Sequence, residues 1–301
     1  MTIKILSNPS PRTNLKSFLT RIPFLVAVKR AVEDLLNIDG KRGKTKLDVT
    51  ASFPLFHPCS LGTYKSRAKL TIQTINQLMP VLWSLIQSLG YKKIQTIELD
   101  EFINTEEQTR VANELKILFD KYQSDKATTH NYHLLYGFIL AQRKEIKRVF
   151  EIGLGTNNTD VVSNMGIKGQ PGASLRAFRD FLANAQIFGA DVDRRVLFAE
   201  ERIQTYYVDQ TNESSFELLN ESLPADFDLM IDDGLHSPNA NLQSLKLFLP
   251  KIRIGGWAII EDIGNAALPL WEIVGAILPS NYQPIIFKTK GAILFAVKRV
   301  T

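Results

Sequence analysis

The chain has 301 residues, of which 45% are hydrophobic and 22% are charged, so it can bury a sizeable core and is expected to be globular. It contains no uninterrupted apolar run of about 18 residues, which argues against a membrane span. Its first residues also lack the pattern of a signal peptide. The single cysteine, Cys59, excludes an internal disulfide and is consistent with a cytoplasmic location, which we expect.

The net charge of +5 is concentrated near the N-terminus, because residues 1–70 hold 13 Lys and Arg against 4 Asp and Glu. A basic arm of this kind can contact nucleic acid or an anionic membrane surface. Here the basic residues lack the interleaved aromatic residues typical of RNA binding, and they gather in residues 41–46, which is typical of a solvated loop. We therefore expect no nucleic-acid partner.

Residues 1–110 are expected to form a mainly helical region, separate from the rest of the chain. Apolar residues recur at helical spacing in residues 15–36 and 70–89, and Pro80 predicts a kink or break in the second helix. Residues 38–68 are rich in Pro, Gly, Ser and Lys, which predicts a loop, and a third helix is predicted over residues 105–122. Such amphipathic helices often pack between subunits, so we expect a homo-oligomer, and we expect the region to cover the acceptor site as a lid.

From Lys147 onward, short apolar runs alternate with helical patterns, which is typical of a parallel sheet. Strands are predicted at 148–152, 186–190, 203–208, 227–231 and 256–260, with helices beginning near Ser174, Arg194, Glu213 and Asn239. Residues 284–288 and 292–297 flank a turn and predict a terminal hairpin. The pattern indicates an α/β, Rossmann-like domain over residues 111–301, with a seven-stranded sheet that includes one antiparallel strand. Residues 156–172 and 264–283 are interpreted as loops.

Two of the predicted strands end in carboxylates. The apolar run of residues 227–231 is followed by Asp232, Asp233, Gly234, Leu235 and His236, and the run of residues 257–260 is followed by Glu261 and Asp262. In open α/β sheets, ligands bind at the carboxyl edge of the parallel strands. Acids at that edge could hold a divalent cation beside a histidine that accepts a proton.

The first predicted strand ends in a glycine-rich turn that is typical of a nucleotide site. Glu151 is followed by Gly153 and Gly155, which let the backbone approach a ligand closely. Asp191 ends the second strand, where its carboxylate could accept ribose hydroxyls, and Asp209 with Gln210 could reach an adenine edge. The third glycine of G-x-G-x-x-G and a phosphate-binding G-x-x-x-x-G-K-[ST] loop are both absent. The pattern therefore favours an adenosine ligand without phosphates, and S-adenosylmethionine fits this description.

Several motifs in chain order resemble class I methyltransferases, and more closely the metal-dependent sugar O-methyltransferases of macrolide biosynthesis, of the macrocin and mycinamicin type. They are residues 151–155, 172–181, 187–193, 208–211, 232–236 and 260–262, with Ser124-Asp125-Lys126, His130, Tyr132 and Tyr136 upstream. The resemblance covers residues 120–265 and leaves out residues 1–105. It implies S-adenosylmethionine and Mg²⁺ as cofactors and a sugar-containing natural product or surface glycan as acceptor.

Carried over motif by motif, the resemblance implies three sets of site residues. Asp233, Glu261 and Asp262 are expected to bind Mg²⁺, and His236 is expected to be the catalytic base. The expected cofactor-binding residues are Glu151, Gly153, Gly155, Ser174, Asp191, Asp209, Gln210 and Asp232. The family's usual small residue before the histidine is Leu235 in this chain, which changes the wall beside the base.

Each of these residues also has a simpler interpretation, and other functions stay open. Asp232 could brace its turn, Asp233 could cap the helix that follows, and His236 could be a structural donor. His130 and His133 are interpreted as packing residues. The alternative functions are a methyltransferase for a catechol-like or nitrogen acceptor, and a non-catalytic module that keeps the fold for assembly.

Overall fold

The computed structural model describes residues 64–91 and 93–301, so the predicted helix over residues 15–36 lies outside the described residues. The chain divides into two compact units, Met1–Val81 and Leu82–Thr301. The expected domain boundary near residue 110 stays a prediction, although residues 95–98 already pair with the sheet of the second unit. The sheet and the candidate site belong to the second unit.

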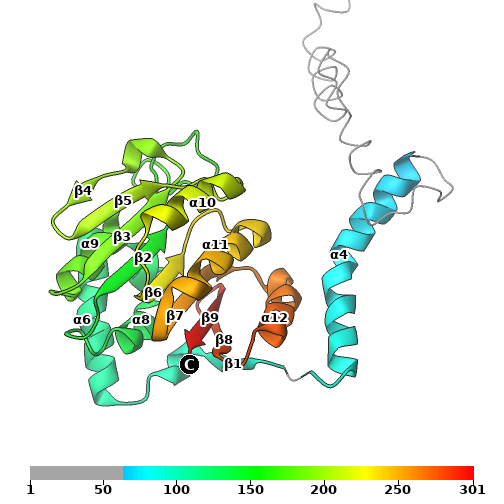
Figure 1. The fold of residues 1–301 in the computed structure, drawn as a ribbon, viewed down its shortest axis with the longest axis horizontal. Helices are drawn as coiled ribbons and strands as arrows, with labels where there is room; N and C mark the ends of the chain where they lie inside the picture. The colour runs from blue at the N-terminus through cyan, green and yellow to red at the C-terminus, as the bar shows by residue number, and fades with distance from the viewer. Residues whose placement is uncertain (1–63, 92) are drawn as a thin grey trace, which may run out of the picture. The chain divides into compact units, whose positions relative to one another are not determined.

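The helices among the described residues are α4 (Tyr64–Ser88), α5 (Leu99–Phe102), α6 (Glu106–Tyr122), α7 (Asp125–Thr128), α8 (His133–Ile139), α9 (Ala173–Phe181), α10 (Glu213–Ser222), α11 (Pro238–Lys251) and α12 (Leu268–Ile277), with 3-10 turns η1 (Arg194–Val196) and η2 (Asn265–Ala267). The strands are β1 (Gln95–Glu98), β2 (Arg148–Ile152), β3 (Gln186–Asp191), β4 (Ala199–Glu200), β5 (Ile203–Tyr207), β6 (Phe227–Asp232), β7 (Ile252–Ile263), β8 (Tyr282–Lys288) and β9 (Ile293–Arg299). Figure 1 labels most of them.

The strands form one sheet in the order β1-β8-β9-β7-β6-β2-β3-β5-β4. The central strands β7, β6, β2, β3 and β5 are parallel to one another, whereas β9 runs antiparallel to both β7 and β8, and the short strand β4 runs antiparallel to β5. The seven expected strands are therefore present with the expected antiparallel strand, and the predicted α/β fold class is confirmed. The sheet is wider than predicted, because the short strands β1 and β4 extend its two edges.

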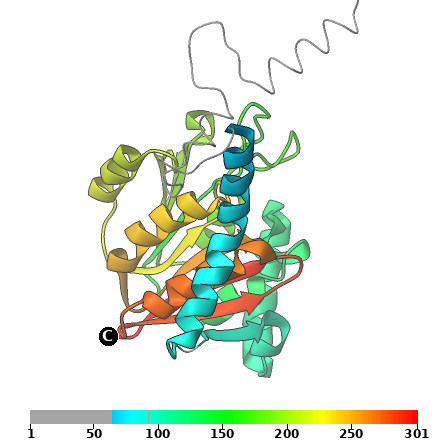
Figure 2. The ribbon, with the colours of Figure 1, turned by 90° about the vertical axis from the view of Figure 1, so that its right-hand side faces the viewer.

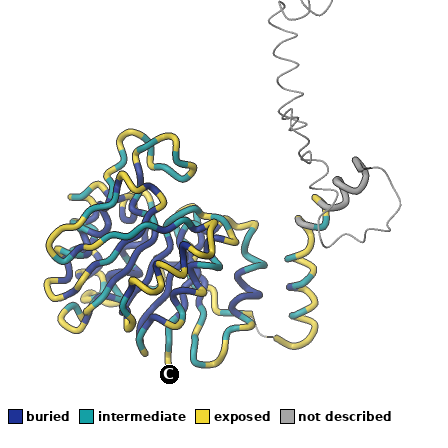
Figure 3. The backbone as a smooth tube through the Cα atoms, turned by 45° about the horizontal axis from the view of Figure 1, so that its top comes forward, coloured by how far each residue is buried: buried dark blue, intermediate teal, exposed yellow. Residues whose placement is uncertain are grey.

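Helices cover both faces of the sheet, as Figure 1 shows. On one face, α6, α8 and α9 pack on the sheet through side chains such as Leu115, Leu135 and Phe178. On the other face, α10, α11 and α12 contribute Phe216, Phe248 and Trp271 to a second core. Because both faces are covered, side chains on both sides of the central strands are shielded from water, and every residue of β6 is buried. Figure 3 shows this buried interior.

Local signals explain where some elements begin and end. Thr105 caps α6, accepting from the backbone N–H of Gln108 in a capping box, so this helix forms where the sequence predicts it. Figure 2 shows the hairpin of β8 and β9 near the C-terminus, which was predicted from its turn residues. Strand β2 lies between β3 and β6 and runs parallel to both (Figure 1), and Ile152 pairs with Ala190 and Asp232, so the last residues of these strands share one edge of the sheet.

The structure corrects four details of the sequence interpretation. The helix expected near Arg194 is only the 3-10 turn η1, because β4 occupies the short connection that follows. Residues 268–277, interpreted as loop, form α12, with a proline at the start of the helix where its missing N–H is harmless. Helix α4 begins at Tyr64, inside the predicted loop, and it continues through Pro80 without a break. No helix among the described residues is long and apolar enough to cross a membrane.

Helix α8 buries a histidine whose charged form the fold disfavours. His133 is 9% exposed, and its Nδ1 has no hydrogen-bond partner among the described residues. Burial, and to a lesser extent Lys116, lower the pKa of His133 to about 4, while Asp120 opposes this shift. A histidine in an unfolded chain titrates near pH 6.5. Folding therefore favours the neutral imidazole.

We expect this imidazole to make the protein less stable in mild acid. The neutral His133 makes its full contribution to the free energy of unfolding above about pH 6.5. This contribution is lost as the pH falls towards about 4, because the unfolded chain then binds a proton that the folded chain does not. The loss should reach about 3 kcal/mol at most. Urea unfolding at several pH values, compared between the wild type and His133→Gln, measures it. Equal pH dependence in the two proteins would contradict the assignment.

Candidate active site

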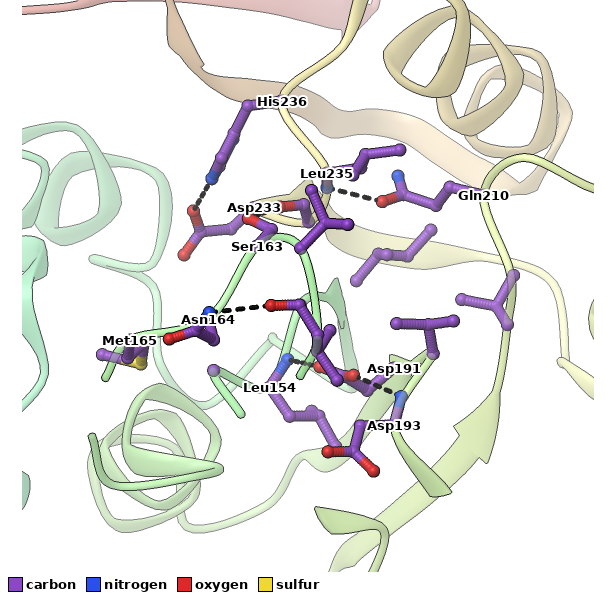
Figure 4. A pocket seen from close by; sticks show the side chains of 18 of the residues that line it. Leu154, Ser163, Asn164, Met165, Asp191, Asp193, Gln210, Asp233, Leu235 and His236 are labelled. Carbon is purple, nitrogen blue, oxygen red and sulfur yellow. Dashed lines mark hydrogen bonds and ion pairs between the residues drawn. The ribbon is translucent and has the colours of Figure 1, made fainter. Parts of the chain in front are cut away.

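A cavity of about 900 Å³ lies at the carboxyl edge of the central strands. Its lining combines the turn after β2, the ends of β3 and β5, the turn after β6 and Asp262 of β7. Segment 160–165 of the long loop between β2 and α9 also contributes to the wall (Figure 4). The predicted nucleotide motif and part of the predicted metal site therefore open into one cavity.

In the wall of the cavity, the turn after β2 has a backbone that only glycine fits well. Gly153 has a φ of +97°, and a Cβ atom on it would lie 2.0 Å from the backbone oxygen of Asp233. Gly155 has a φ of +77°, and its Cβ would meet the sulfur of Met165. The two glycines thus let the turn after β2 fit against the turn after β6 and the long loop.

Asp191 lies at the end of β3 and lines the cavity. Its Oδ2 accepts from the backbone N–H of Leu154 at 2.8 Å, and its Oδ1 accepts from that of Asp193 at 2.8 Å, as Figure 4 shows. Burial raises the pKa of Asp191, whereas these backbone donors lower it. The two bonds fix the carboxylate at the cavity wall, and each oxygen has a further lone pair for a ligand hydroxyl.

Asp232 and Gln210 form a polar network that braces the turn after β6. Asp232 is fully buried and accepts from Gln210 Nε2 at 2.9 Å and from Asn241 Nδ2 at 2.9 Å. Gln210 Oε1 accepts from the backbone N–H of Leu235 at 2.8 Å (Figure 4). Gln210 and the less buried Asp209 both line the cavity, whereas the carboxylate of Asp232 faces the network. The bracing interpretation of Asp232 therefore fits the geometry better than cofactor contact.

Asp233, His236 and Asp262 come together at one end of the cavity. One ligand atom from each lies within 4.8 Å of the others. His236 Nε2 is 3.8 Å from Asp233 Oδ1 and 3.8 Å from Asp262 Oδ2. His236 and Asp262 both have a φ of 54°, a left-handed conformation that costs a non-glycine residue about 1 kcal/mol or more. The fold holds these two residues in a strained conformation at the point where their side chains meet.

Glu261 and Glu151 are not brought into this cluster. Glu261 is 1% exposed, and Glu151 is fully buried. A lysine explains both positions: the ammonium of Lys126 lies 2.5 Å from Glu261 Oε2 and 3.0 Å from Glu151 Oε1. The same ammonium lies 2.6 Å from Asp233 Oδ2. Ser174, which lines the cavity, donates its hydroxyl to the other oxygen of Glu151.

Two tyrosines complete the surroundings of the acids. Tyr136 donates its hydroxyl to Glu261 Oε1, and Tyr132 donates to Asp262 Oδ1. Both phenols are buried, which raises their pKa, and the neighbouring carboxylates raise it further. They therefore act as proton donors in hydrogen bonds and stay neutral. His130 stacks on Tyr132 at 4.8 Å between ring centres, which agrees with a packing role.

The role of Lys126 was missed in the sequence interpretation, although its motif was noted. Helix α7, which carries it, has four residues and lies 107 positions before Asp233 in the chain. A single lysine in a polar segment is usually exposed. The available signal was chemical: several carboxylates at one sheet edge require a buried cation, and the nearby basic residue in the family-like motif is Lys126.

At this edge of the sheet, burial and the neighbouring charges shift the pKa values of Lys126 and its acidic partners in opposite directions. Burial alone would lower the pKa of Lys126, but Asp233, Glu151 and Glu261 raise it well above its ordinary value. Burial raises the pKa of Glu261 well above its ordinary value, and Lys126 opposes this shift. The same opposition holds for Asp233. The lysine is therefore charged, and it is the largest influence that lowers the pKa of its acidic partners against the effect of burial.

No protein-family model matches the chain. Among curated proteins, it is 30% identical over 152 residues to 8-demethyl-8-(2-methoxy-alpha-L-rhamnosyl)-tetracenomycin-C 3'-O-methyltransferase of Streptomyces olivaceus, covering 50% of this chain and 36% of that protein. It is 33% identical over 128 residues to demethylmacrocin O-methyltransferase of Streptomyces fradiae, covering 42% of this chain and 30% of that protein. The matched regions span about a third of the length of these relatives.

Among solved structures, a methyltransferase from the mycinamycin biosynthetic pathway, in complex with Mg, SAH and mycinamycin VI, matches with a TM-score of 0.50 and 24% identity. The match covers 62% of this chain and 53% of that one. The chain has a class I methyltransferase fold. The resemblance to macrocin- and mycinamicin-type enzymes, inferred from the motifs, is confirmed by these comparisons.

The methyltransferase fold makes a specific demand on Gly153. We expect Gly153→Ala to push the turn after β6 away and to weaken both stability and ligand binding, because the new Cβ would overlap a backbone oxygen. Gly291→Ala is the matched control: Gly291 also has a positive φ, of +81°, but nothing lies within 4 Å of its Cβ position. The control should lose only about 1–2 kcal/mol of stability, which is the cost of a non-glycine residue at a positive φ. Thermal unfolding of both variants tests this, and an equal loss would contradict the close-approach argument.

Proposed function

We propose that the protein is an S-adenosylmethionine-dependent, Mg²⁺-assisted O-methyltransferase that acts on a sugar hydroxyl. The observation that carries the proposal is the continuity of the cavity, which extends from Asp191 to the cluster of Asp233, His236 and Asp262. One end thus offers the groups expected for an adenosine ligand, and the other offers two acids and an imidazole. The sugar O-methyltransferase relatives support the same reaction.

S-adenosylmethionine fits the nucleotide end of the cavity. The volume of about 900 Å³ is in the range of pockets that enclose small-molecule ligands. Asp191 is positioned to accept ribose hydroxyls, and Asp209 and Gln210 are positioned along the same wall. The tight turns at Gly153 and Gly155 bring backbone groups to the cavity without side chains in the way. The solved relatives with bound SAH support this cofactor.

Mg²⁺ fits the other end through its preference for oxygen. This ion is usually held by one or two carboxylates together with water and substrate oxygens. Asp233 and Asp262 are partly exposed to the cavity and supply these carboxylates. Glu261 as a third ligand stays a prediction. In this structure its two oxygens accept hydrogen bonds from Lys126 and Tyr136. The solved relatives with Mg support the choice of metal.

His236 is proposed as the base, because Mg²⁺ does not require its nitrogen. When bound, S-adenosylmethionine supplies a methyl group for in-line transfer to oxygen, and Mg²⁺ makes the attacking hydroxyl easier to deprotonate. The imidazole Nε2 lies between Asp233 and Asp262, so it can accept a proton from a hydroxyl held beside them. Asp233 and Asp262 stabilise the imidazolium that forms.

The acceptor is proposed as a sugar-containing natural product or surface glycan. The names of the relatives support this, since they include methyltransferases of rhamnosyl tetracenomycin and of demethylmacrocin. We also propose that the protein is a cytoplasmic homo-oligomer. The single cysteine supports the location, and the amphipathic pattern of residues 70–89 supports an interface between subunits.

Isothermal titration tests the cofactor assignment without knowledge of the acceptor. We expect S-adenosylmethionine and S-adenosylhomocysteine to bind in the micromolar range, with Mg²⁺ and also with EDTA, because the nucleotide end does not need the metal. Asp191→Ala should weaken the binding of both ligands by about tenfold or more. The substitution removes an acceptor of hydrogen bonds that are worth about 1.5–3 kcal/mol. Failure of both ligands to bind the wild type would refute the proposed function.

Methyl transfer tests His236. We expect His236→Ala to reduce turnover by about 100-fold or more, the usual contribution of a general base, while cofactor affinity stays close to that of the wild type. A panel of aryl glycosides that includes a rhamnoside, assayed with methyl-labelled S-adenosylmethionine and Mg²⁺, provides the measurement. His133→Gln is the control, because His133 lies on α8 outside the cavity lining. Normal turnover in His236→Ala would remove the histidine from the mechanism.

A further inference from the structure

Within the part of the chain that the structure describes, the buried ammonium of Lys126 forms its ion pairs with acids of the candidate site. Lys126 is 1% exposed, and its nitrogen forms ion pairs with Glu151, Asp233 and Glu261, which follow or end the neighbouring strands β2, β6 and β7. A lysine ammonium has three N–H donors, so one donor is available for each carboxylate. The lysine thus joins the nucleotide motif, through Glu151, to the acids beside the metal cluster.

A second buried lysine shows what a purely structural role looks like in this fold. Lys251 at the end of α11 is 9% exposed, and its ammonium donates to the backbone oxygens of Asn220, Leu223 and Pro224. Those bonds stabilise the connection between α10 and β6, away from the cavity. Lys126 differs because all three partners are charged side chains and because it lines the cavity itself.

The carboxylate of Asp233 is divided between the lysine and the metal cluster. Its Oδ2 lies 2.6 Å from Lys126 Nζ, while its Oδ1 lies 3.8 Å from His236 Nε2. The lysine therefore orients Asp233 with one oxygen towards the cluster. It also neutralises much of the charge of this carboxylate before any cation arrives. Glu261 is held in the same way, between Lys126 and Tyr136.

We propose that Lys126 is a positioning residue that weakens the affinity of the Asp233–Asp262 site for a divalent cation. The ammonium shares the Asp233 carboxylate with the cation, and two positive charges on one carboxylate repel each other. It also pairs with Glu261 and so offsets the attraction of that carboxylate for the cation. A weak site binds the ion mainly when acceptor oxygens add to the coordination. This inference rests on the proposed function, because it takes the cluster as a metal site.

Titration of Mn²⁺ alone, followed by calorimetry and by electron paramagnetic resonance of the free ion, tests the inference without cofactor or acceptor. We expect Lys126→Met to bind Mn²⁺ at least tenfold more tightly than the wild type. Lys126→Arg keeps the positive charge and should bind within about threefold of the wild type. Lys251→Met, the matched control, should lose stability but keep the wild-type affinity for Mn²⁺.

The outcomes separate this inference from the function that it rests on. Unchanged or weaker Mn²⁺ binding in folded Lys126→Met would overturn the role of the lysine and leave the metal site intact. If the wild type binds no Mn²⁺, the metal assignment fails, and this inference fails with it. If Lys126→Met does not fold, the double variant Lys126→Met, Glu151→Gln replaces it in the test, because it removes one charge of each sign from the buried network. That protein should bind Mn²⁺ at least tenfold more tightly than Glu151→Gln alone, and equal binding would overturn the inference.

Discussion

The ion pairs between the Lys126 ammonium and the acids of three neighbouring strands are the interaction on which the site depends. Parallel strands that end in carboxylates concentrate negative charge at one edge of the sheet, and burial makes each of these charges unfavourable. Lys126 lies within 3.0 Å of Glu151, Asp233 and Glu261. Removing one partner from such a buried network typically costs about 3–5 kcal/mol, so the network holds the turn after β6 and the end of β7 in register.

The sheet topology gives this lysine its partners. The order of β7, β6 and β2 in the sheet brings residues from positions 151, 233 and 261 side by side. The short helix α7 then lies where Lys126 can reach all three. The backbone of the site is also strained, because His236 and Asp262 both hold left-handed conformations. Such conformations persist only where the surrounding structure determines them. Lys126 holds Asp233, three residues before His236, and Tyr132 donates to Asp262.

The acids around the cavity differ in what they can bind because they differ in burial. Acids that face the interior, Asp232 and Glu151, are bound by protein donors and shape the turns around the ligand. Acids that face the cavity, Asp233 and Asp262, keep an oxygen near His236 and are available to a cation or an acceptor. The sequence interpretation assigned Glu151 and Asp232 to the cofactor, and Asp233 and Asp262 to the metal. It could not tell which acids face the interior, because neighbouring acids in one motif point in different directions.

The sequence by itself determined the α/β class, the seven principal strands with their antiparallel member, and the two strand ends that carry Asp233, His236 and Asp262. It could do so because alternation of apolar runs and strand-end motifs are local properties. Tertiary structure alone decided the burial of Lys126, the hydrogen bonds that Asp232 accepts and the position of Glu261 outside the cluster. The positions of Lys126 and Glu261 depend on contacts between residues more than 100 positions apart, such as Lys126 with Asp233, and no local pattern encodes such a pairing. The hydrogen bonds of Asp232 come from residues 9 and 22 positions away, and they depend on which way its side chain points in the folded turn.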